Sequence, residues 1–118
     1  MHANQTVGKY GERVAARYLL RHGYEILETN WRGDAGEVDI IARKGEIAVI
    51  VEVKTRRGTG FGHPASAVNG RKLRRLKQLA VEWLREQKDF YPAVRFDVIS
   101  ILCADRGAAD VEHLKAVV

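Results

Sequence analysis

Two segments of the chain have the apolar spacing of amphipathic helices. The first extends from about residue 6 to residue 22, and Gly23 directly after it provides a C-terminal stop. The second extends from about residue 70 to residue 87. Because residues three and four apart lie on one side of a helix, each segment is expected to bury a single apolar stripe. The stripes consist of Val7, Tyr10, Val14 and Tyr18 in the first helix and Leu73, Leu76, Ala80, Trp83 and Leu84 in the second.

Five further segments are predicted to be strands. Residues 36–43 and 46–55 are largely apolar and are separated by Lys44-Gly45, which favours a tight hairpin. The other predicted strands are 24–28, 93–102 and 111–118, the last of them an edge strand. The order is then helix, three strands, helix and two strands. This order predicts an α/β fold with a mixed sheet flanked by helices.

Length and composition restrict the class of protein further. The 118 residues are expected to form one domain, 1–118, because this length suffices for a hydrophobic core. A single cysteine, Cys103, excludes an internal disulfide and a zinc site built from several cysteines. The chain has no apolar stretch near the roughly 20 residues of a membrane span, and its first residues do not resemble a secretion signal. We therefore expect a cytoplasmic protein with no membrane partner.

The charge of the chain indicates a polyanionic partner. The formal net charge is +5, and cations gather in two short segments, "KTRR" at 54–57 and "RKLRRLK" at 71–77. These segments lie on either side of the Gly-rich stretch "RRGTGFGHP", which is predicted to be a loop that becomes ordered on DNA. Such basic clusters are typical of surfaces that follow a nucleic-acid backbone, although solvated basic faces also occur without a partner.

The apolar strand 46–55 contains a carboxylate and an ammonium group, Glu52 and Lys54. Residues two apart in a strand lie on one face, so these two charges are expected together. Burial of ions costs several kcal/mol per ion unless they are paired or coordinated. The pair therefore indicates either a salt bridge at the end of the strand or a functional site.

Hairpin geometry adds acidic residues to the same face. If Arg43 pairs with Glu46, the numbers of opposite residues add up to 89, so that Asp39 faces Ile50 and lies diagonal to Glu52. Diagonal neighbours are roughly 7–8 Å apart along the backbone, a distance that suits two carboxylates on one cation. In this register Glu37 faces Glu52 and also shares the face. A shift by one residue would move Asp39 to the other face.

Two interpretations of these charges remain open at this point. Carboxylate ligands without nitrogen or sulfur favour Mg²⁺ or Mn²⁺, and such an ion activates water and polarises a phosphodiester. In that case Lys54 would stabilise the charge of the transition state. Alternatively, Lys54 pairs with Glu52 or Asp39 at a solvated strand end.

The spacing of these residues is also found in a known enzyme superfamily. Asp39, twelve intervening residues and the triplet Glu52-Val53-Lys54 resemble the PD-(D/E)XK nuclease signature, although the proline before the first acidic residue is missing. A longer resemblance covers about residues 8–102 and is to the YraN-type family of small bacterial proteins. It is carried by "GKYGERVAARYL", "GYEILETNWR", "GEVDIIA", "VIVEVKTR", "FGHPASAV", "KLRRLKQLA" and "RFDVISI".

The resemblance implies a fold and a set of site residues. The YraN-type family is similar to archaeal Holliday junction resolvases, whose restriction-endonuclease-like core has the order αβββαβ. Transferred to this chain, the resemblance makes Asp39 and Glu52 metal ligands and Lys54 the catalytic lysine. It also implies that the Val53 carbonyl and Glu12 lie at the metal. The alternative for Glu12 is a solvated helix residue that caps the helix or pairs with Arg13 or Arg17.

Other polar residues are given weaker roles. Glu37 either supports the site or pairs with an arginine such as Arg56. Asp97 is expected to form an internal salt bridge or hydrogen bond. Contacts to DNA phosphates are expected from Arg32, Arg56, Arg57, Lys72 and Arg75.

The expected function is that of a Mg²⁺- or Mn²⁺-dependent DNA endonuclease that hydrolyses phosphodiester bonds, with branched or Holliday junction DNA as the expected substrate. Cutting both strands of a junction would require two sites, and hence a homodimer. The alternatives are a non-catalytic nucleic-acid-binding module and an adaptor in DNA uptake or repair on the same fold.

Overall fold

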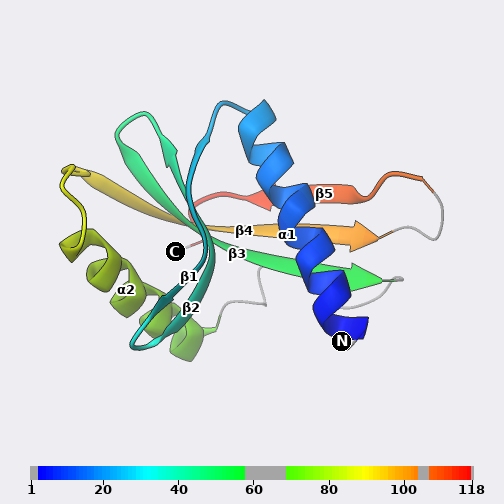
Figure 1. Ribbon diagram of the computed structural model, residues 1–118, viewed down its shortest axis with the longest axis horizontal. Coiled ribbons are helices and arrows are strands. Elements are labelled where there is room, and N and C mark those ends of the chain that lie inside the picture. Colours follow the sequence, from blue (N-terminus) through cyan, green and yellow to red (C-terminus); the bar gives the residue numbers. More distant parts are fainter. Residues whose placement is uncertain (1–2, 58–68, 104–106, 118) are drawn as a thin grey trace.

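A computed structural model describes residues 3–57, 69–103 and 107–117, with side chains from Val7 onward. Figure 1 shows a twisted sheet with one helix on each side. Most of the predicted Gly-rich loop falls in residues 58–68, outside the described residues, and its predicted ordering on DNA is not addressed by the structure. The elements are α1 (Ala3–Arg21), β1 (Glu25–Gly33), β2 (Gly36–Lys44), β3 (Ile47–Arg57), α2 (Gly70–Arg85), β4 (Ala93–Cys103) and β5 (Asp110–Leu114).

The predicted order of elements and the αβββαβ core are confirmed. The largest difference is in β1, which continues to Gly33 instead of ending at Glu28. β1 is an edge strand with one partner, and much of it is exposed. Its second half therefore contains polar residues such as Asn30 and Arg32, and the apolar pattern of the sequence did not predict this part of the strand. At the other end, β5 stops at Leu114, and Val117 N donates to Phe96 O at 2.9 Å.

The five strands form one mixed sheet in the order β1-β2-β3-β4-β5. Among these strands only β3 and β4 are parallel; the other neighbouring strands are antiparallel. A parallel pair needs a crossover connection, and α2 lies within it. Helix α1 lies across one face of the sheet, whereas α2 packs on the other face against β1 and β2.

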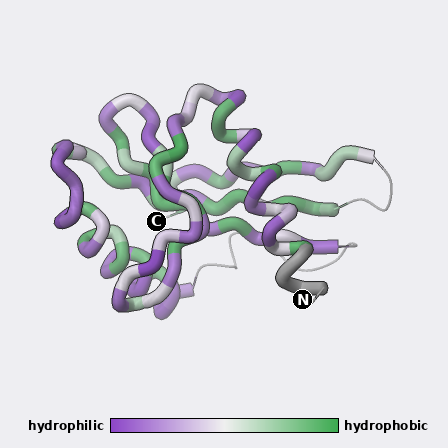
Figure 2. The backbone as a smooth tube through the Cα atoms, viewed as in Figure 1, coloured by the Kyte–Doolittle hydropathy of each residue, from purple (hydrophilic) through white to green (hydrophobic). Residues whose placement is uncertain are grey.

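The hydrophobic core consists of two clusters, one on each face of the sheet. In β3, Val49 and Val51 pack in the cluster beneath α1, while Ala48 and Ile50 pack in the cluster beneath α2. This alternation explains why β3 is a continuous apolar run, since a strand covered on both faces has no solvent side. Figure 2 shows β3 and β4 as hydrophobic over most of their length, whereas hydrophilic and hydrophobic residues alternate along α2.

The hairpin between β2 and β3 has a different register from the one predicted. Lys44 pairs with Ile47 and Ile41 with Ile50, so opposite numbers add up to 91 and not to 89. The prediction that Asp39 faces Ile50 is therefore wrong by two residues. Gly45 has a φ of 60° and occupies the first central position of the two-residue turn. Glycine is favoured at this position in type II′ hairpin turns.

Asp97 is part of a buried polar network that joins β4 to the C-terminal segment. Its carboxylate accepts from Arg95 Nε at 2.9 Å, lies 2.7 Å from His113 Nε2 and accepts from Ala116 N at 3.0 Å. Burial alone would raise the pKa of Asp97, but the hydrogen bonds from His113, Arg95 and Ala116 hold it below its ordinary value. The predicted internal role of Asp97 is confirmed.

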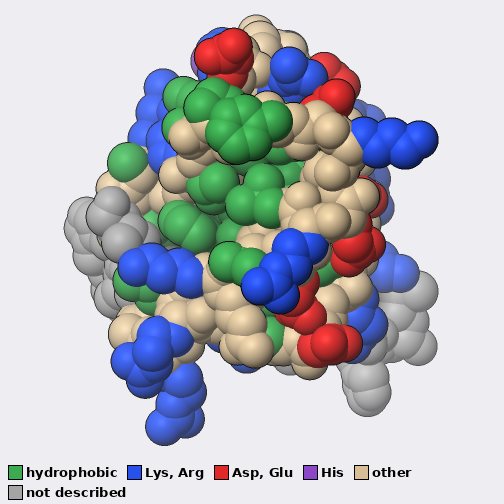
Figure 3. All heavy atoms as spheres, turned by 90° about the vertical axis from the view of Figure 1, so that its left-hand side faces the viewer, with side chains coloured by type: hydrophobic (Ala, Val, Ile, Leu, Met, Phe, Trp, Pro, Cys, Tyr) green, Lys and Arg blue, Asp and Glu red, His purple; other side chains and the backbone are tan. Residues whose placement is uncertain are grey.

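One end of the molecule has an apolar surface. Figure 3 shows hydrophobic side chains in the middle of this end and charged side chains around them. The most exposed large apolar side chain that the structure describes is Phe90, 86% exposed in the segment between α2 and β4. Neither described helix is long and apolar enough to cross a membrane.

Candidate functional site

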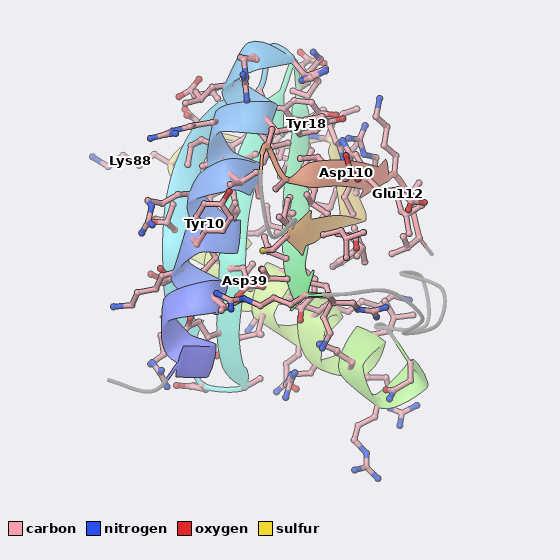
Figure 4. The ribbon with its side chains drawn as sticks, turned by 90° about the vertical axis from the view of Figure 1, so that its right-hand side faces the viewer. Tyr10, Tyr18, Asp39, Lys88, Asp110 and Glu112 are labelled. Atoms are coloured by element: carbon pink, nitrogen blue, oxygen red, sulfur yellow. The ribbon has the colours of Figure 1, made fainter. Side chains whose placement is uncertain are left out.

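A pocket of about 280 Å³ lies between the N-terminal half of α1 and β3. At the open end of the β2–β3 hairpin, the last paired residues are Ile40 and Val51. Asp39, which precedes Ile40 in β2, lies just outside the paired region. Figure 4 shows Asp39 beside the first turns of α1. The pocket has room for a hydrated ion and a phosphate group and is smaller than a typical ligand cavity. Its lining consists of Val7, Gly8, Glu12, Asp39, Val53, Lys54 and Thr55.

Close contact between α1 and β3 depends on Gly11. A Cβ atom built on Gly11 would lie 1.7 Å from Thr55 Oγ1, so only glycine allows the helix backbone to approach the strand this closely. The contact places the next residue, Glu12, at the wall of the pocket. The sequence pattern did not identify Gly11, because a glycine within a helix gives no indication of the strand that it contacts.

Asp39 is largely buried, and its Oδ2 accepts a hydrogen bond from Val53 N at 2.8 Å. Burial, followed by the nearby charge of Glu52, raises the pKa of Asp39 to about 7. The Val53 N–H opposes this shift, whereas Glu12 and Glu37 add to it. Asp39 therefore lies in a concentration of negative charge that a bound cation would relieve.

Glu52 is directed toward α2. Its Oε1 lies 2.5 Å from Lys72 Nζ, and the Glu52 and Lys72 side chains are only 13% and 22% exposed. Lys54 is exposed, lines the pocket and forms no ion pair within the described part of the chain. Glu52 lies on the α2 side of β3 together with Ile50, as predicted, and Lys54 lines the pocket together with its neighbours Val53 and Thr55. The alternative pairing of Lys54 with Glu52 or Asp39, all three of them described residues, is absent.

Asn30 connects the remaining carboxylates and was not identified from the sequence. Its Nδ2 donates to Glu12 at 2.8 and 3.0 Å and to Glu37 at 3.1 Å. Glu37 also pairs with Arg32 at 3.0 Å, so the arginine partner predicted for Glu37 is present and is Arg32. Glu12 instead accepts from Asn30, and among the described residues it forms no ion pair with the predicted alternatives, Arg13 and Arg17. Asn30 has a φ of 49°, which is unusual for a residue within a strand and frequent at functional sites. The only sequence signal was an asparagine inside "ETNWR".

The acidic groups fit a divalent ion that keeps much of its hydration shell. Within the described ranges, no three His, Cys, Asp or Glu side chains lie close enough to hold one ion together. A ligand set of Glu12, Asp39 and Glu52 is therefore not assembled. Mg²⁺ is commonly bound by one or two carboxylates, waters and substrate phosphates. The residues suited to hold it are Asp39, the Val53 carbonyl and one further carboxylate, Glu52 or Glu12.

The predicted phosphate-binding residues differ in their surroundings. Arg57 and Arg75 are exposed, Arg32 is exposed but paired with Glu37, and Arg56 is half-buried. Lys72 is engaged by Glu52. The turn between β1 and β2 is fixed on α2, because a Glu82 oxygen accepts from Asp34 N at 2.8 Å. Arg32 and Arg75 thus belong to elements that contact each other.

Comparison with known proteins places the chain among bacterial relatives. The family model described as "Uncharacterised protein family UPF0102" matches residues 11–101. A UPF0102 protein of Beutenbergia cavernae is 50% identical over 117 residues, which cover 99% of each chain. A UPF0102 protein of Rhodococcus opacus is 50% identical over 112 residues, 95% of each chain. One of Streptomyces coelicolor is 46% identical over 119 residues, covering 99% of this chain and 92% of the relative.

Proposed function

The chain belongs to the UPF0102 family, the YraN-type family that its motifs predicted, and we propose that it is a metal-dependent DNA endonuclease. The observation that carries this proposal is the pocket at the end of the β2–β3 pairing. There Asp39, the Val53 main chain and Lys54 meet beside Glu12 of α1. Asp39, Val53 and Lys54 line one small pocket, and a carboxylate, a main-chain oxygen and an ammonium group are groups that suit the hydrolysis of a phosphodiester.

Each residue would have a distinct part in the reaction. A bound Mg²⁺ or Mn²⁺ would supply an activated water and polarise the phosphate. Asp39, held by the Val53 N–H, would fix the ion, and Lys54 would stabilise the negative charge of the transition state. The water oxygen bonds to phosphorus as the bond to the 3′ oxygen breaks. The products carry a 3′ hydroxyl and a 5′ phosphate.

For the substrate we propose branched DNA, including Holliday junctions. The exposed cations Arg57 and Arg75 suit phosphates, and such contacts orient a nucleic acid without reading its sequence. Selection would then rest on the shape of the DNA. A homodimer would supply the two sites that cutting both strands of a junction requires.

A second candidate function is a nucleic-acid-binding module or an adaptor in DNA uptake or repair, without catalysis. The observation that favours it is that two acidic groups already have partners in the protein. Lys72 neutralises Glu52, and Asn30 donates to Glu12. On this proposal the same cationic surface binds DNA and the pocket takes no part.

Cleavage assays distinguish these functions. The purified protein is incubated with Mg²⁺ or Mn²⁺ and a four-way junction, a flap or a linear duplex. We expect metal-dependent cleavage by the wild type, no cleavage by Glu52→Ala, and wild-type cleavage by Glu112→Gln, a control in the exposed part of β5. Binding of DNA by all three proteins without cleavage would favour the module. Absence of any nucleic-acid binding at moderate salt would contradict both functions.

A further inference from the structure

Lys72 differs from the other cations in the first turns of α2. Its ammonium group is directed at the sheet and contacts Glu52, whereas Arg71, Arg74 and Arg75 are exposed. The backbone around Lys72 is also fixed, because the Asn69 side chain caps the helix and accepts from Lys72 N at 2.9 Å. The contact thus joins a fixed helix turn to the central strand of the sheet.

The Lys72–Glu52 contact occupies one of the two carboxylates that are suited to join Asp39 at a metal ion. Glu52 directly precedes Val53, whose N–H holds Asp39, so one short segment of β3 contacts both Lys72 and Asp39. An ammonium group at 2.5 Å and a metal ion would draw on the same carboxylate oxygens. Because both side chains are mostly buried, neither charge is well solvated when the other leaves. Loss of the contact thus requires a new partner for each group.

We propose that Lys72 is a positioning residue that holds Glu52 until a metal ion binds and then transfers to a phosphate of the nucleic acid. This inference rests on the proposed function and specifies how binding of the metal ion and binding of DNA are linked. Metal at Glu52 releases Lys72 toward the basic side of α2, where Arg71 and Arg75 are exposed. Conversely, a phosphate that attracts Lys72 frees Glu52 for the metal. Because such coupling is reciprocal, DNA raises the affinity for metal and metal raises the affinity for DNA.

Metal binding without DNA tests the competition directly. Isothermal titration with Mn²⁺ is carried out on the wild type, Lys72→Met, Lys72→Arg and the double variant Lys72→Met/Glu52→Gln. Lys77→Met, an exposed lysine on the same helix, controls for the loss of one positive charge. We expect Lys72→Met to bind Mn²⁺ at least about fivefold more tightly than the wild type. Lys72→Arg and Lys77→Met should bind as the wild type does, and the double variant should lose the gain.

A second titration tests the coupling. With a short DNA duplex whose linkages resist hydrolysis, the wild type should bind Mn²⁺ more tightly than it does alone, and Lys72→Met should show little further gain. Thermal melting provides a readout independent of activity, because Lys72→Met should melt lower than the wild type in EDTA and recover in Mn²⁺. If Lys72→Met does not fold, Lys72→Gln replaces it.

The outcomes separate this inference from the proposed function. If the wild type binds Mn²⁺ and Lys72→Met binds it no more tightly, the inference is wrong and the endonuclease proposal stands. If Lys72→Met gains affinity but no DNA is cut, the competition is supported and the endonuclease proposal fails. Absence of Mn²⁺ binding to every variant contradicts both.

Discussion

Asp39 combines two features that are costly to keep without a partner cation. Its carboxyl group is largely buried and lies near Glu52, which together raise its pKa to about 7, while the N–H of Val53 holds it in place. Groups with strongly shifted pKa values in a pocket are frequent in functional sites. Their cost in stability can be measured separately from any activity.

We predict that Asp39→Asn stabilises the metal-free protein at pH 8. Between the ordinary pKa of 3.8 and about 7, the folded protein keeps a proton that the unfolded chain has lost, so wild-type stability falls as pH rises through this window. Above pH 7 the variant should be more stable by roughly 2–4 kcal/mol, and at pH 4 the difference should vanish. Asparagine retains an acceptor for the Val53 N–H. Urea unfolding at both pH values measures this, and a variant that is less stable at pH 8 contradicts it.

At this scale the sequence identified some residues of the site and missed others. Asp39 and Lys54 were found because charges stand out in apolar strands, and they do line one pocket. The partner of Glu52 was missed, because Lys72 is distant in the sequence and looked like one of several surface cations. Asn30 was missed because its contacts depend on a left-handed backbone conformation that no local pattern specifies.

At the scale of elements, the site depends on how closely α1 approaches β3. Gly11 permits the approach. Gly8, one turn earlier, lines the pocket, and a Cβ atom built on it would meet no described atom within 4 Å. Two glycines in one helix therefore have different structural roles. Substitution by alanine should distinguish them.

Gly11→Ala is expected to destabilise the protein by about 1–3 kcal/mol, because its Cβ would overlap the Thr55 side chain and push α1 away from β3. Gly8→Ala, in open space, should stabilise it by up to about 1 kcal/mol through the higher helix propensity of alanine. Denaturant unfolding of both variants compares the two effects. Equal stability of the two variants would show that the helix does not rely on this contact.

Element order was predictable and hairpin register was not. Apolar periodicity defined both helices and the central strands because these elements are buried. The register depended on whether the two-residue turn is Lys44-Gly45 or Gly45-Glu46. The first turn pairs Arg43 with Glu46, and the second pairs Lys44 with Ile47, so the partner of each β2 residue differs by two positions. Both choices leave Asp39 close to Glu52 along the hairpin, so their predicted proximity survived the error in register.

For the molecule as a whole, the pocket lies beside α1 and most of the cations considered for DNA belong to β3 and α2. The β3 segment from Glu52 to Arg57 connects the two, since it contacts α2 through Lys72 and lines the pocket through Val53 and Lys54. The net charge of +5 favours the binding of a polyanion to the molecule. Hydrolysis of DNA is the central claim that this arrangement supports.

Cleavage of a four-way junction at pH 8 with Mg²⁺, by the wild type and by Asp39→Asn, tests that claim most directly. The variant is expected to be at least as stable as the wild type, so a loss of cleavage cannot be attributed to unfolding. The account predicts products with 5′ phosphates from the wild type in Mg²⁺, none in EDTA, and none from Asp39→Asn. Equal cleavage by both proteins, or none by the wild type on any branched or linear DNA, would contradict it.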